Sequence, residues 1–93
     1  MAEGAFKGRS MKAVAGDVAE GLITVNPLFL KKFDKDMLVG LNEHLSKTMT
    51  AVRNERLPFN DPAALRKRNL KLQRLNNALI ILKNIAREKK IPL

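Results

Sequence analysis

Few side chains in this chain of 93 residues have the type and spacing that chemistry requires. His44 is the only imidazole, and it lacks the second histidine or the cysteines that a zinc site would need. Asp34 and Asp36 lie two residues apart at an expected helix start, where carboxylates cap a helix and favour its dipole. A calcium loop would need several further oxygen ligands. We therefore expect no catalytic residues, no metal site and no cofactor, and a protein that is not an enzyme.

The glycine and cysteine residues likewise indicate no phosphate-binding loop, metal site or catalytic nucleophile. Gly4 and Gly8 are close together, but no G-K-[ST] sequence follows them and no strand is expected before them, so a phosphate-binding loop is rejected. The chain has no cysteine, which excludes disulfides, thiolate metal sites and cysteine nucleophiles.

The remaining candidate residues are basic, and they are concentrated at one end of the chain. The net charge is +9, and residues 62–93 supply +8 of it because Glu88 is their only acidic residue. A field of one sign this concentrated attracts anions. We expect the partner to be nucleic-acid phosphates, with an acidic protein surface as the alternative; an anionic membrane surface would be attracted in the same way. The candidate contact residues are Arg66, Lys67, Lys71, Arg74, Lys83 and Arg87.

The arrangement of these cations leaves several interpretations open. Lys67, Lys71 and Arg74 share one side of the expected helix and form a basic strip, which could be a solvated face, a phosphate contact or a contact to an acidic protein. Another side carries the amides Asn69, Gln73, Asn76, Asn77 and Asn84. Amides can read base edges, but this spacing fits a neutral exposed face equally well.

The elements that must position these residues are helices. Apolar periodicity and two Asx-Pro pairs, Asn26-Pro27 and Asp61-Pro62, predict an all-α fold. Residues 1–10 are expected to be a flexible lead-in and residues 11–93 a single small helical domain. The expected helices cover about residues 11–25, 27–33, 35–56 and 62–90. A short strand at 22–25 is the competing interpretation of the end of the first segment.

Helices 35–56 and 62–90, joined by a short turn, are expected to form an antiparallel hairpin. The second helix is about 42 Å long against about 33 Å for the first. Its end, around residues 84–90, should therefore overhang and be covered by the N-terminal segment or by another chain. Beyond Asn77 its apolar arc widens to roughly 160°, which indicates a protein interface and, as a hypothesis, a homo-oligomer. The expected interface residues are Leu79, Ile81, Leu82, Ile85 and Ala86.

The composition is that of a folded protein, with 45% apolar residues. The first 20 residues lack the apolar core of a secretory signal, and Asn26-Pro27 breaks the longest apolar stretch, residues 22–30. We expect no transmembrane segment and a soluble protein of the cytoplasm or another intracellular compartment.

Over about residues 38–90, the helix, the Asx-Pro turn and the basic second helix resemble the small two-helix protein of the large ribosomal subunit. No diagnostic motif accompanies this resemblance, and the N-terminal part of the chain does not fit it. Two functions remain from the residues themselves. The first is binding of nucleic-acid phosphates in a nucleoprotein assembly. The second is a structural or adaptor subunit that packs through its long amphipathic helix without contacting nucleic acid.

Overall fold

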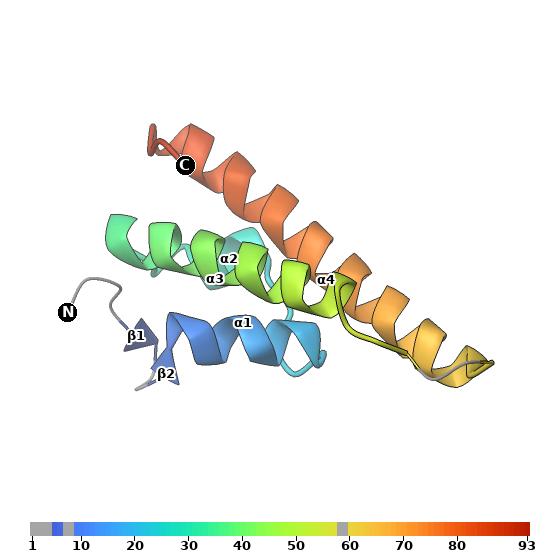
Figure 1. Ribbon diagram of the computed structural model, residues 1–93. Helices are drawn as coiled ribbons and strands as arrows, with labels where there is room; N and C mark the ends of the chain where they lie inside the picture. The colour runs from blue at the N-terminus through green and yellow to red at the C-terminus, as the bar shows by residue number, and fades with distance from the viewer. Residues whose placement is uncertain (1–4, 7–8, 58–59) are drawn as a thin grey trace.

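The computed structural model describes residues 5–6, 9–57 and 60–93. The burial of side chains is described from Ser10 onward. The fold is all-α, with a long C-terminal helix that packs against an earlier helix, as expected (Figure 1). The elements in chain order are β1 (Ala5–Phe6), β2 (Arg9–Ser10), α1 (Met11–Ala19), α2 (Pro27–Leu30), α3 (Lys35–Arg53) and α4 (Pro62–Glu88).

Every helix begins at a side-chain cap, because the first amides of a helix have no partner within it. The four caps are Ser10 to the Ala13 amide (3.2 Å), Asn26 to Phe29 (2.8 Å), Asp34 to Met37 (2.8 Å) and Asp61 to Ala64 (3.1 Å). Pro27 and Pro62 occupy the first helical positions, where a missing N–H costs nothing. Helix starts therefore follow from the local sequence.

The observed C-terminal ends of the helices differ from the expected ones more than the helix starts do. Helix α1 ends at Ala19 rather than near residue 25, and the segment after it forms no strand. The Gly21 amide donates to the Val18 carbonyl at 3.1 Å, and the Leu22 amide donates to the Asp17 carbonyl at 2.8 Å. This is a Schellman motif, which stops the helix because Gly21 adopts a φ of +79°. Helix α2 ends at Leu30, and α3 ends at Arg53.

The expected flexible lead-in contains a short strand pair. Strands β1 and β2 are antiparallel, with Ala5 opposite Ser10 and Phe6 opposite Arg9. Ser10 also caps α1, so the pair leads directly into the first helix. The rest of the lead-in, residues 1–4 and 7–8, lies outside the described residues.

The core is shared by α1, α3 and α4. Helix α3 runs in the same direction as α1, and α4 crosses back over them in the opposite direction (Figure 1). The largest fully buried side chains are Met11, Val14, Leu30, Leu38, Leu41, Leu45, Leu75 and Leu82. None of the helices in the described part of the chain is long and apolar enough to cross a membrane.

Helix α4 overhangs at its N-terminal end, whereas residues 84–90 were expected to overhang. Its first buried residue is Leu75, and the turns before it extend beyond α1 and α3 (Figure 1). Its C-terminal half contacts the N-terminal segment: α2 packs against α4, and the Lys89 ammonium donates to the Phe33 carbonyl at 3.4 Å. Over residues 54–57, the connection from α3 continues toward the start of α4 (Figure 1).

Candidate functional site

The six cations expected to bind an anion do not share one surface. Lys71 and Arg74 are half-buried against the rest of the molecule, whereas the other four, Arg66, Lys67, Lys83 and Arg87, are exposed. Lys67 lies two turns before Arg74 on the same side of α4. The other three exposed cations, Arg66, Lys83 and Arg87, lie on the solvent-facing side of α4.

Lys71 and Arg74 hold the C-terminal end of α1. The Arg74 guanidinium donates to the Ala19 carbonyl oxygen at 3.1 Å, and the Lys71 ammonium pairs with the Glu20 carboxylate at 3.2 Å. The last carbonyls of a helix carry partial negative charge, so cations there are favourable. Gly21 makes room for the Arg74 guanidinium because it has no side chain; a Cβ on Gly21 would lie 2.8 Å from Cζ of Arg74. Both cations therefore have a role in the fold, and their expected phosphate contact stays a prediction.

The solvent side of α4 carries a continuous polar surface, which we name the amide face. At 100° per residue its members fall within an arc of about 120°. They are Arg66, Asn69, Gln73, Asn76, Asn77, Ile80, Lys83, Asn84 and Arg87, and all are exposed. No acidic residue occurs between residues 62 and 87. The amide face therefore combines hydrogen-bonding groups and positive charge without a neutralising carboxylate in its own helix up to Arg87.

Charge and amides are distributed unevenly along the amide face. Arg66 lies near one end, and Lys83 and Arg87 lie near the other, with Arg66 and Arg87 about 31 Å apart at 1.5 Å per residue. The part between them has amides together with Ile80, whose side chain is 51% exposed. Sequence reasoning identified the amides as a group but did not include Ile80, although the same helix projection places this residue among them.

The expected protein interface is largely part of the chain's own core. Leu79, Leu82 and Ala86 are buried, and Ile81 and Ile85 pack half-buried against the same core. The sequence left two covers open, the N-terminal segment or another chain. Helices α1 and α2 of the N-terminal segment pack against α4 together with α3. The broad apolar arc of α4 reflects burial between several helices of one molecule.

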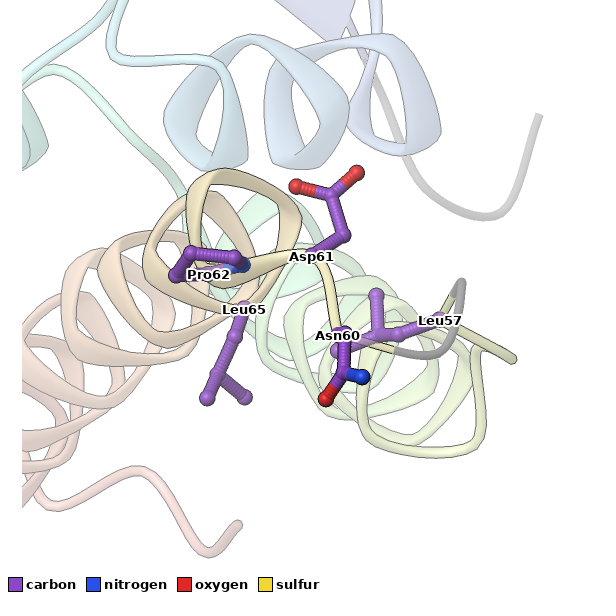
Figure 2. Close-up of a pocket in the computed structure, with 5 residues that line it drawn as sticks. All are labelled: Leu57, Asn60, Asp61, Pro62 and Leu65. Atoms are coloured by element: carbon purple, nitrogen blue, oxygen red, sulfur yellow. The ribbon is translucent and has the colours of Figure 1, made fainter.

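A shallow pocket of about 470 Å³ lies at the tip of the overhang (Figure 2). Leu57 from the connection and Pro62 and Leu65 from the first turn of α4 give it apolar walls, together with Asn60 and Asp61. The Asp61 carboxylate points away from Leu65 and accepts the Ala64 amide, so it is occupied as a helix cap. The pocket offers an apolar surface with one amide and has no pair of groups for acid–base chemistry.

His44 is half-buried on α3 and has an interaction partner. It lies in a shallow surface pocket of about 320 Å³ with Lys12, Lys47, Thr48 and Ala51, and Lys47 pairs with Glu43 at 3.1 Å. Within residues 5–6, 9–57 and 60–93, His, Asp and Glu form no group of three that could hold a metal ion.

Comparison with known proteins gives no match for this chain: no family model, curated protein or solved structure is significantly similar to it. The surface of α4 is therefore the feature from which a function can be inferred.

Proposed function

We propose that this chain is a non-enzymatic, intracellular nucleic-acid-binding protein that contacts phosphates through the cations of the amide face, Arg66, Lys83 and Arg87. The observation that carries the proposal is the amide face itself, which is exposed along its whole length and has no carboxylate in its helix between residues 62 and 87. Four other basic side chains of α4 and its C-terminal cap, Lys67, Arg68, Lys89 and Lys90, add to the field around it.

The proposed contact has a defined thermodynamic signature. Each phosphate that a Lys or Arg neutralises releases counterions, so the logarithm of the affinity falls with the logarithm of salt concentration by about 0.9 per contact on duplex DNA. Three contacts from the amide face predict a slope of about −3, with additional contributions from neighbouring lysines. Phosphate contacts fix position and supply affinity, but they carry no sequence information by themselves.

The test is fluorescence anisotropy with a labelled duplex DNA and a structured RNA at about 50 and 200 mM salt. The variant Arg66→Glu/Lys83→Glu/Arg87→Glu should lose binding, because it reverses all three cations of the amide face. The control Lys31→Glu/Lys32→Glu/Lys35→Glu makes the same change in net charge at exposed residues near α2 and the start of α3. Equal loss in both variants would show attraction to net charge alone, and no binding by the unchanged protein at 50 mM salt would refute the proposal.

A second candidate function, a structural or adaptor subunit, is favoured by the overhang of α4. Leu65 is 43% exposed beside the tip pocket, and Arg68, on the core-facing side of the same turns, has a buried Nε without a hydrogen-bond partner. A protein partner packed along these turns would cover the exposed Leu65 side chain. Leu65→Gln should abolish assembly with such a partner and leave nucleic-acid binding unchanged, because it removes the apolar surface without changing the charge.

A further inference from the structure

We infer that the amide face is built for the major groove of B-form duplex DNA, with adenine and thymine at the centre of its site. This inference rests on the proposed function and names the class of nucleic acid. It follows from three properties of α4: its dimensions, the order of the residues along its amide face, and its lack of aromatic side chains.

The width of α4 fits the major groove of B-form DNA. An α-helix with its side chains is about 10–12 Å across, and the major groove of B-form DNA is about 12 Å wide. The major groove of A-form RNA is deep and too narrow for side chains to read. The amide face is exposed from Arg66 to Arg87, so more than five turns of α4 present it without a neighbouring helix in the way.

The order of residues along the amide face matches the curvature of the groove. A straight helix can follow the curved groove only over its middle turns, so the middle of this face of about 31 Å lies on the groove floor while its ends meet the backbone. Arg66, Lys83 and Arg87 occupy those ends, where phosphates lie. Gln73, Asn76 and Asn77 occupy the middle, where base edges lie.

The chemistry of the middle favours A·T pairs. Asn and Gln side chains make bidentate hydrogen bonds to N6 and N7 of adenine, and apolar side chains contact the thymine methyl group. Ile80 lies in the centre of the face, between Asn76 and Asn84, and is 51% exposed. An exposed isoleucine between amides is explained by a thymine methyl contact.

Single-stranded nucleic acid is a poor match for this surface. Proteins that bind single strands stack successive bases on aromatic side chains, at about 1–3 kcal/mol per base. Residues 62–93 contain no Phe, Tyr or Trp, so the amide face offers no stacking platform.

The experiment measures anisotropy with five labelled probes of equal length: A·T-rich duplex DNA, G·C-rich duplex DNA, double-stranded RNA, single-stranded DNA, and the A·T-rich duplex with 7-deazaadenine. Removing N7 changes one major-groove acceptor and leaves the backbone intact. We expect the A·T-rich duplex to bind tightest, the G·C-rich duplex about fivefold or more weaker, and the deaza duplex weakened to a similar degree. The two remaining probes should bind weakest.

The matched variants separate base contacts from phosphate contacts. Gln73→Ala/Asn76→Ala should remove the preference for A·T and keep the slope with salt. Asn54→Ala, at an exposed amide beyond the end of α3, should change neither. Alanine has a higher helix propensity than either amide residue, so the fold should be retained, and circular dichroism checks this.

The outcomes keep the two proposals distinct. If no probe binds at 50 mM salt, the proposed function fails. If double-stranded RNA or single-stranded DNA binds as tightly as the A·T-rich duplex, or if 7-deazaadenine has no effect, the groove assignment is overturned and phosphate binding stands.

Discussion

Arg74 in α4 donates a hydrogen bond to the carbonyl oxygen of Ala19, the last residue of α1, at 3.1 Å and across 55 positions of sequence. The same guanidinium lies against Gly21, whose φ of +79° ends α1. One side chain therefore joins a helix end, a glycine turn and the long helix. This contact explains why the basic strip that the helix projection identifies is in part a structural element.

Gly21→Ala should lower the free energy of unfolding by about 2 kcal/mol or more. Left-handed backbone costs an L-residue about 1–2 kcal/mol, and the added Cβ would lie 2.8 Å from Cζ of Arg74. Urea denaturation measures this loss. Gly16→Ala is the matched control, because a Cβ there meets nothing within 4 Å. It should stabilise α1 by up to about 1 kcal/mol, and a comparable loss in both variants would contradict our assignment.

Arg74→Met should lower the free energy of unfolding by about 1–2 kcal/mol, because it keeps an unbranched apolar side chain and removes a charged donor to a helix carbonyl. Thermal unfolding should shift down by roughly 4–8 °C per kcal/mol for a domain of this size. Arg87→Met removes an exposed cation and should leave the unfolding temperature nearly unchanged. If Arg87→Met proves the more destabilising of the two, the structural role of Arg74 is wrong.

Lys90→Gly should raise stability by about 1 kcal/mol. Lys90 lies just beyond the end of α4 and has a φ of +59°. The amide of the next residue, Ile91, donates to the Ala86 carbonyl at 2.8 Å. Glycine removes the steric cost of this conformation, although the greater freedom of the unfolded chain offsets part of the gain. Glu88→Gly provides the comparison, because Glu88 is the exposed last residue of α4 and should lose stability on the same change. Calorimetry of the two variants measures whether their stabilities change in these opposite directions.

Leu82→Ala should destabilise the fold by about 2–5 kcal/mol, since Leu82 is fully buried between α4 and the helices that cover it. Ile80→Ala, two residues earlier on the amide face, should cost less than about 0.5 kcal/mol. Sedimentation velocity should show the same molecular mass before and after the Leu82 change while the protein remains folded. If the wild-type protein is a dimer and Leu82→Ala converts it to folded monomers, Leu82 lies in an interface between two chains.

The sequence alone determines the class of fold and the positions at which helices begin. Asn26-Pro27 and Asp61-Pro62 act on amides three residues away, so their effect is local and readable in the chain. The alternation of apolar and polar residues likewise shows which side of each long helix is buried. The concentration of positive charge after residue 62 is a property of composition and needs no structure.

Only the tertiary structure decides which of these cations are free. A helix projection gives the same direction to Lys67, Lys71 and Arg74, yet α1 engages the last two and leaves the first exposed. The projection likewise cannot show that the N-terminal segment covers Leu82 and Ala86 while the first turns of α4 stay uncovered. The physical reason is distance along the chain: caps and periodicity act within a few residues, whereas the partner of Arg74 comes from a helix end 55 positions away.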